Sequence, residues 1–184
     1  MTVAPLAGRY PAELEHTWEP AGGPLLSIRP LRPDDIEREI RFVTALSPAT
    51  RYLRLQYAAN TASARDIERL LDVDYVGRLA IAALTAQDIV GVSRYSRIEG
   101  TSRAECAIVV ADAWQGRGLG SELMRSLVQA AHARGIDCLE GETLAENQRI
   151  VDWARRSGFK LRTEPNTGGR LKVYVDLDLL PAAS

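Results

Sequence analysis

The most informative stretch of the sequence is residues 104–121, AECAIVVADAWQGRGLGS. Its apolar first half predicts a buried strand, and the pattern from Gly120 to Arg134 predicts an amphipathic helix. Three glycines, Gly116, Gly118 and Gly120, alternate with other residues between the two elements. Because glycine tolerates backbone conformations closed to other residues, such a turn can wrap closely around a ligand and direct several N–H groups at it. The turn is therefore predicted to bind phosphate.

The glycine turn fits other known motifs less well. A dinucleotide-binding fingerprint would place its third glycine at Ser121, and only about sixty residues follow for the rest of a doubly wound sheet. Glu140, however, follows the glycine turn at about the distance in sequence at which dinucleotide-binding folds have a carboxylate that binds the ribose. A nucleotide-hydrolase P-loop needs a lysine beside its last glycine, and the chain has lysine only at positions 160 and 172. The turn could also start a helix without binding any ligand, but this would not explain why an arginine, Arg117, lies among three glycines. Arg117 and Ser121 can both contact an anion.

Short strands and helices lie on both sides of this turn. We expect strands over 25–29, 79–85, 89–98, 104–111, 138–143, 159–162 and 171–179. We expect helices over 34–46, from Pro48 through Leu55, from Ser63 onward, over 120–134 and over 147–157. Short turns join most of the strands and predict antiparallel neighbours, whereas the strand–helix–strand run from 104 to 143 predicts one parallel pair. Prolines and glycines throughout residues 1–24 predict an extended N-terminal arm, so the compact domain is expected to span residues 25–184.

Composition limits the function classes. The 184 residues suit one domain, and 23 basic against 24 acidic side chains give a net charge of −1. This balance supplies no broad positive field to hold nucleic acid or an anionic membrane. The longest apolar runs are far too short for a membrane helix, and the N-terminus lacks a secretory pattern, so a cytoplasmic location is expected. Two histidines and two cysteines without ligand spacing predict no metal site.

Two motifs carry a resemblance to a known family. Residues 115–120 match the Q/R-x-x-G-x-G/A motif of the GNAT acyltransferases, which in that family follows a strand, opens a helix and binds the pyrophosphate of acetyl-CoA. Asn147, an amphipathic helix and then Gly158-Phe159 resemble the family's segment after its fifth strand. Phrases within residues 28–33, 46–54 and 111–116 are similar to the acetyltransferase domain of Pat-type protein lysine acetyltransferases.

The resemblance implies both a fold and a donor. The fold is an α/β GNAT domain with a mixed, mainly antiparallel sheet and helices on both faces. Its sheet splays between the fourth and fifth strands, here 104–111 and 138–143, and forms a V-shaped cleft. Acetyl-CoA is the acyl donor that this cleft is expected to hold. The donor-binding residues implied in this way are Ile108, Val109, Val110, Gln115, Gly116, Arg117, Gly118, Leu119, Gly120, Ser121 and Asn147.

Acyl transfer to an amine also needs a base that removes a proton near the thioester. Glu105 is our candidate, because protein-acetylating GNAT enzymes place a glutamate early in this strand, and Glu142 is the reserve. A solvated glutamate at a strand end is the plainer interpretation of Glu105. Asn147 could equally cap the following helix. Many GNAT enzymes have a tyrosine general acid seven residues after this asparagine, where the chain has Ala154.

The acceptor is the least determined part of the function. The Pat-like phrases and Glu105 favour a lysine side chain of a protein, for which family resemblance nominates an acyl-CoA synthetase. Arg51, Tyr52 and Tyr57 are candidates for the acceptor wall. A small-molecule amine remains an alternative, with a second ammonium group held by carboxylates at Asp72, Asp74, Glu140 and Glu142. A third alternative is a catalytically silent module that binds acyl-CoA, which the missing tyrosine favours.

Overall fold

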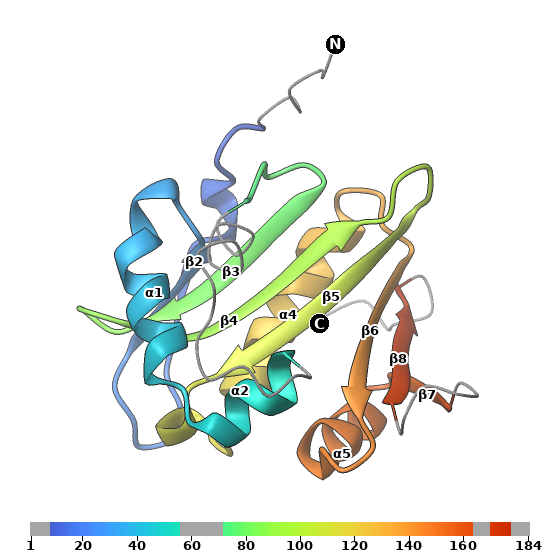
Figure 1. Ribbon diagram of the computed structural model, residues 1–184. Coiled ribbons are helices and arrows are strands. Elements are labelled where there is room, and N and C mark those ends of the chain that lie inside the picture. Colours follow the sequence, from blue (N-terminus) through green and yellow to red (C-terminus); the bar gives the residue numbers. More distant parts are fainter. Residues whose placement is uncertain (1–7, 56–71, 164–169, 178–184) are drawn as a thin grey trace.

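The fold is seen in a computed structural model that describes residues 8–55, 72–163 and 170–177. Eight strands form one sheet in the order β1-β2-β3-β4-β5-β6-β8-β7 (Figure 1). The strands are β1 (His16–Trp18), β2 (Leu26–Pro30), β3 (Arg78–Leu84), β4 (Ile89–Arg97), β5 (Arg103–Val110), β6 (Cys138–Leu144), β7 (Lys160–Thr163) and β8 (Arg170–Asp176). Only β5 and β6 pair in parallel among these strands. The predicted mixed, mainly antiparallel sheet is confirmed.

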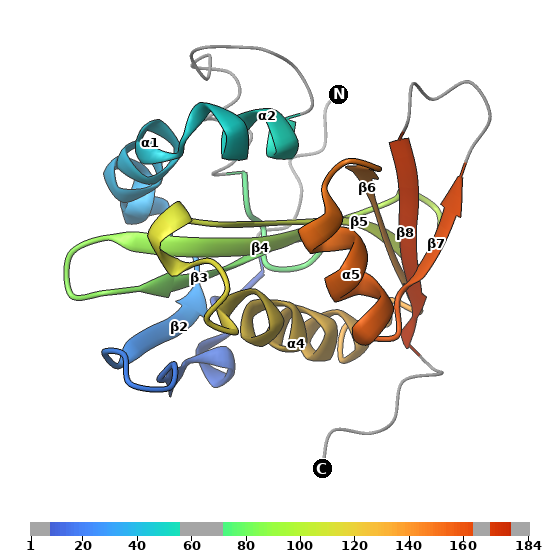
Figure 2. The ribbon, with the colours of Figure 1, turned by 90° about the horizontal axis from the view of Figure 1, so that it is seen from below.

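Helices cover both faces of the sheet. Figure 2 shows α1 (Ile36–Ala45) and α2 (Pro48–Leu55) on one side and α4 (Leu119–His132) and α5 (Gln148–Arg156) on the other. The buried leucines of α4 recur every four residues, which places them on one stripe of the helix. They pack with Ile28 and Ile81, whereas Phe42 and Val43 of α1 pack with Ala80, Ala82 and Val92 on the opposite face. The helix predicted to start at Ser63 lies outside the described residues.

The sheet opens between β5 and β6. Their parallel pairing joins only Arg103–Glu105 to Cys138–Glu140, although both strands continue beyond it. Gly141 stands at the point of divergence, where an added Cβ would lie 2.7 Å from the carbonyl oxygen of Cys106. The later halves of the two strands therefore have unshared backbone edges, and the predicted splay is present.

The sheet begins earlier in the chain than the sequence predicts. His16–Trp18 pairs with β2 as an edge strand, although these residues fall within the expected arm of 1–24. This strand also contacts the start of α4, because His16 Nε2 lies 2.7 Å from Glu122 Oε1 and Trp18 lies beside Gly118. A segment of three residues is too short to show the alternating pattern of a strand. Its extended structure depends on pairing with β2. The division into an arm and a domain over 25–184 stays a prediction.

A buried ion pair fixes the start of α1. Both carboxylate oxygens of Asp35 accept hydrogen bonds from the guanidinium of Arg29, at 2.6 and 2.7 Å, and Asp35 is 1% exposed. Burial raises the pKa of this carboxyl, but the hydrogen bonds from Arg29 and from the N–H of Arg32 outweigh it and lower the pKa to about 2. The ionised form is thus strongly preferred in the folded protein.

Asp35→Asn should lower the free energy of unfolding by about 3–5 kcal/mol, because it leaves the charge of Arg29 buried without its partner. The folded pKa lies below the ordinary value of 3.8, so the carboxylate stabilises the fold above that pH. About 2 kcal/mol of this stabilisation should disappear as the pH falls toward 2. Urea denaturation across this pH range measures both effects. Asp88→Asn, which breaks an exposed pair with Arg41, should cost at most about 1 kcal/mol; an equal loss in the two variants would contradict the account.

Candidate active site

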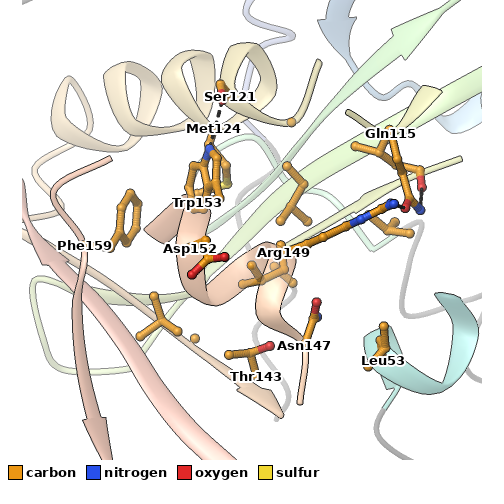
Figure 3. Close-up of a pocket in the computed structure, with 18 of the residues that line it drawn as sticks. Leu53, Gln115, Ser121, Met124, Thr143, Asn147, Arg149, Asp152, Trp153 and Phe159 are labelled. Carbon is orange, nitrogen blue, oxygen red and sulfur yellow. Dashed lines mark hydrogen bonds between the residues drawn. The ribbon is translucent and has the colours of Figure 1, made fainter. Parts of the chain in front are cut away.

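A cleft of about 650 Å³ opens where β5 and β6 diverge. Figure 3 shows its walls, which come from β5, β6, the start of α4 and α5. Nine of the predicted donor-binding residues line it: Ile108, Val109, Val110, Gln115, Gly116, Gly118, Gly120, Ser121 and Asn147. The strand edge, the glycine turn and the asparagine, which are far apart in sequence, therefore face one space.

The glycine turn has the backbone that its composition predicts. Gly116 and Gly118 have φ of +77° and +86°, a left-handed conformation that other residues adopt at a cost. The N–H groups of Ser121 and Glu122 both donate to the carbonyl oxygen of Gly118. The earlier N–H groups belong to the set that a helix start leaves without intrahelical acceptors. An anion in the cleft would meet these groups together with the positive end of the α4 dipole.

Two predicted residues do not line the cleft with their side chains. Leu119 is 1% exposed and packs against Gly91 in the core. The guanidinium of Arg117 lies 5.5 Å from the ring centre of Trp114. The sequence shows which residues form the turn but not the direction of each side chain. Any donor contact from Leu119 is accordingly limited to its backbone N–H.

Gln115 joins three elements around the cleft. Its Nε2 donates to the carbonyl oxygen of Val110 at 3.0 Å and to Thr50 Oγ1 at 3.3 Å. Its Oε1 accepts a hydrogen bond from Arg149 of α5, and Figure 3 shows Arg149 extending toward Gln115. The side chain of Gln115 therefore connects the end of β5, helix α2 and helix α5.

Asp112 fixes the start of α2 beside the glycine turn. It accepts hydrogen bonds from the N–H and hydroxyl of Ser47 and from the hydroxyl of Thr50. Burial raises the pKa of Asp112, but these hydrogen bonds outweigh it and lower the pKa below its ordinary value. Ser47 Oγ also accepts from the N–H of Thr50, so Ser47 caps α2.

Asn147 precedes α5 at the N-cap position but makes no capping hydrogen bond with its side chain. Its side chain instead lines the cleft, and Figure 3 shows it near Thr143. The side chain of Asn147 is therefore not used as a cap, and its role as a ligand contact stays a prediction.

The two candidate bases lie in different places. Glu105 is exposed and lines a second hollow of about 290 Å³ together with Arg78, Arg94 and Ser96. Cys106 and Ala107 line both this hollow and the cleft, so the two spaces are adjacent. Among the described residues, Glu105 has neither an ion pair nor a side-chain hydrogen bond. Glu142 lines the cleft itself and lies 3.7 Å from Arg170.

The sequence and fold of this chain are similar to those of known proteins. A family model described as the acetyltransferase (GNAT) domain matches residues 26–160, which is more than half of the chain. The chain belongs to the GNAT acetyltransferase family. Its relatives support acyltransferase activity for this GNAT chain, with acetyl-CoA as the donor. No helix among the described residues is long and apolar enough to cross a membrane, and those residues contain no cluster of three or more metal-ligating side chains.

Several named proteins are similar to this GNAT chain. It is 37% identical over 143 residues to acetyltransferase PA5475 of Pseudomonas aeruginosa, covering 76% of this chain and 77% of that protein. It is 30% identical over 149 residues to acetyltransferase Pat of Mycolicibacterium smegmatis, covering 74% of this chain but 44% of Pat. The solved GNAT domain of S. lividans PAT is 28% identical with a TM-score of 0.85, covering 91% of this chain and 99% of that one. The predicted likeness to Pat-type domains is confirmed.

Helix α5 contributes side chains to the GNAT cleft that were not predicted from the sequence. Arg149, Trp153 and Arg156 all line it, and Trp153 Nε1 donates to Ser121 Oγ at 2.9 Å. Their spacing of four and three residues places them on one helix face, a signal that was available in the sequence. Ala154, by contrast, is fully buried in the core. The position where many family members have a tyrosine therefore does not line the cleft.

Gly141→Ala should lower the free energy of unfolding by about 1–3 kcal/mol, because the new methyl group would force β5 and β6 apart. Gly120→Ala is the matched control, since a Cβ there would meet Ile108 at an ordinary 3.7 Å. Alanine at that helical position should leave stability unchanged or slightly higher. Urea denaturation of both variants tests this expectation, and full stability of Gly141→Ala would refute it.

Proposed function

We propose that this chain transfers the acetyl group of acetyl-CoA to a lysine side chain of a protein acceptor. The main support for the proposal is that the cleft between β5 and β6 and the hollow that contains Glu105 are adjacent. The cleft has the features of a donor site, and Glu105 lies in a hollow that shares Cys106 and Ala107 with it. The likeness to Pat supports a protein acceptor.

The residues of the cleft fit acetyl-CoA. The N–H groups of the glycine turn and the start of α4 suit a pyrophosphate, and Arg149 and Arg156 add positive charge to the wall. The edge of β5 from Ile108 to Val110 does not pair with β6 and can pair with amides of the pantetheine arm, although the carbonyl oxygen of Val110 already accepts from Gln115. Asn147 can contact the same arm. When bound, the donor supplies a thioester whose carbonyl carbon is open to attack by an amine.

Glu105 serves as the base in this proposal. A lysine ammonium group must lose a proton before its nitrogen can attack, and a carboxylate near the attacking nitrogen accepts that proton directly or through water. Glu105 forms no ion pair among the described residues, although Arg78 and Arg94 line the same hollow. Ala154 has no acidic group and is buried in the core, so it cannot protonate the leaving thiolate, and we propose that solvent water does so.

The carboxylates near the hollow argue against a small diamine as the acceptor. Asp74 Oδ1 accepts three backbone hydrogen bonds, from Val76, Gly77 and Arg78. Asp72 lies 2.7 Å from Arg78, and Glu140 contacts both Arg103 and Lys172. All four carboxylates that could hold a second ammonium group are thus engaged, because Glu142 lies 3.7 Å from Arg170. An open, exposed approach to Glu105 suits a lysine on a protein surface.

A small-amine acceptor remains the second candidate. One relative, 25% identical over 107 residues, is an L-methionine sulfoximine/L-methionine sulfone acetyltransferase of Pseudomonas aeruginosa, and such a substrate is a free amine. The predicted acyl-CoA synthetase partner and the cytoplasmic location stay predictions.

The test is incubation with labelled acetyl-CoA and the host's soluble proteome, beside a panel of free amines, followed by mass spectrometry. We expect lysine-acetylated protein above the level of a no-enzyme control. Strong turnover of one free amine without acetylated protein would replace the lysine assignment. No turnover of any acceptor, with acetyl-CoA still bound, would favour a silent acyl-CoA-binding module.

A further inference from the structure

Part of the sheet face that contains Glu105 is left open by the described helices. The register aligns Glu105 of β5 with Glu140 of β6, Glu140 with Tyr174 of β8, and Tyr174 with Lys160 of β7. These four residues form one row across the sheet. Their neighbours in sequence, such as Leu139 and Val173, pack in the core, so the row points to the opposite face. Figure 1 shows no described helix over this face at β6, β8 and β7.

We define the open sheet face as the side chains of β6, β7 and β8 that point away from α4 and α5. Its acidic and basic side chains are concentrated on different strands, although Lys172 pairs with Glu140 and Arg170 with Glu142. The side nearest β5 has Glu140 and Glu142, next to Glu105. The far side has four cations, which we call the cationic edge: Lys160, Arg162, Arg170 and Lys172. A surface of this kind offers one region to a cation and another to anions.

Three cations of the cationic edge are in long ion pairs or have no carboxylate partner among the described residues. Lys160 and Arg170 have side chains 57% and 45% exposed, and each is 3.7 Å from a carboxylate. Exposed pairs at such distances are weak and exchange partners readily. Arg162 pairs with no carboxylate among the described residues, and its guanidinium lies 6.0 Å from the ring of Tyr174.

We propose that the open sheet face docks a protein acceptor whose target lysine is accompanied by acidic residues, with the lysine at Glu105 and the acidic residues at the cationic edge. This inference rests on the proposed lysine acetylation. Three strand spacings of about 4.8 Å separate Glu105 from Lys160, or about 14 Å. An extended peptide advances about 3.4 Å per residue, so the acidic residues should stand about four positions from the lysine.

The experiment compares two peptides that each contain one lysine. One carries glutamates three and four positions from the lysine, and the other carries arginines there. We expect kcat/KM to be about tenfold higher for the acidic peptide at low salt, and the preference should shrink as ionic strength rises. Lys160→Glu/Arg162→Glu should abolish the preference while leaving acetyl-CoA affinity unchanged. A matched double variant, Arg41→Glu/Arg155→Glu, changes the net charge equally at other exposed sites and should retain it.

The outcomes separate the two proposals. Equal use of both peptides, or a preference that survives Lys160→Glu/Arg162→Glu, would overturn the docking proposal and leave lysine acetylation intact. If neither peptide is acetylated while a free amine is, lysine acetylation fails and the docking proposal fails with it. A preference lost equally in both double variants would show a general charge effect and would also overturn docking at this face.

Discussion

Glu105→Gln is expected to slow acetyl transfer by about 10²- to 10⁴-fold, the usual contribution of a general base. Glutamine has nearly the same shape but cannot accept the proton of the attacking ammonium group. Since Glu105 is exposed and has no partner among the described residues, the substitution should not disturb folding. It should also leave the affinity for acetyl-CoA unchanged, because Glu105 lines the hollow and not the cleft. Single-turnover rates and calorimetric titration measure the two quantities separately.

Glu142→Gln is the matched control for this prediction. Glu142 lines the cleft but lies near Arg170, which already offers it a positive partner. We expect its removal to change the rate by less than about tenfold. If Glu105→Gln keeps the wild-type rate and Glu142→Gln loses it, the base is Glu142. If both variants keep it, neither carboxylate acts as a base.

Gly118→Glu should weaken acetyl-CoA binding by at least about 100-fold. The residue has φ of +86°, so any side chain strains the turn. The added carboxylate would also place a negative charge beside the proposed pyrophosphate site at the start of α4, where like charges repel. Calorimetric titration of acetyl-CoA into the variant measures the loss.

Gly100→Glu separates strain from site chemistry. Gly100 has φ of +73° with nothing within 4 Å of an added Cβ, and it stands in the β4–β5 turn. It should therefore suffer comparable backbone strain and keep wild-type affinity. Unchanged binding by Gly118→Glu would show that the donor site is misplaced. Binding of NADH in preference to acetyl-CoA would restore the dinucleotide-binding interpretation of the glycine turn.

Much of the fold could be predicted because local signals agree with the tertiary structure. Ser47-Pro48 marks the start of α2, and alternating or continuous apolar runs mark the hairpin of β3 and β4. The strand His16–Trp18 could not be predicted, because three residues carry no periodicity and their structure depends on pairing with β2. Its contacts with α4 likewise become visible only in three dimensions.

The candidate site could be predicted at the level of backbone but less well at the level of side chains. The glycine turn and Asn147 face the cleft as expected, since their positions follow from the motif. The side chain of Leu119 does not, because the phase of α4 directs it into the core. The spacing of Arg149, Trp153 and Arg156 indicates that they share a helix face, but only the packing of α5 determines that this face lines the cleft.

Hydrogen–deuterium exchange with and without acetyl-CoA would locate the donor site on the chain. If the donor lies in the cleft between β5 and β6, its addition should slow exchange at the amides of the glycine turn, residues 116–120, and along residues 108–110 of β5. The hairpin turn at Gly100 should exchange unchanged. Slower exchange confined to other parts of the chain, with residues 108–120 unaffected, would contradict the account.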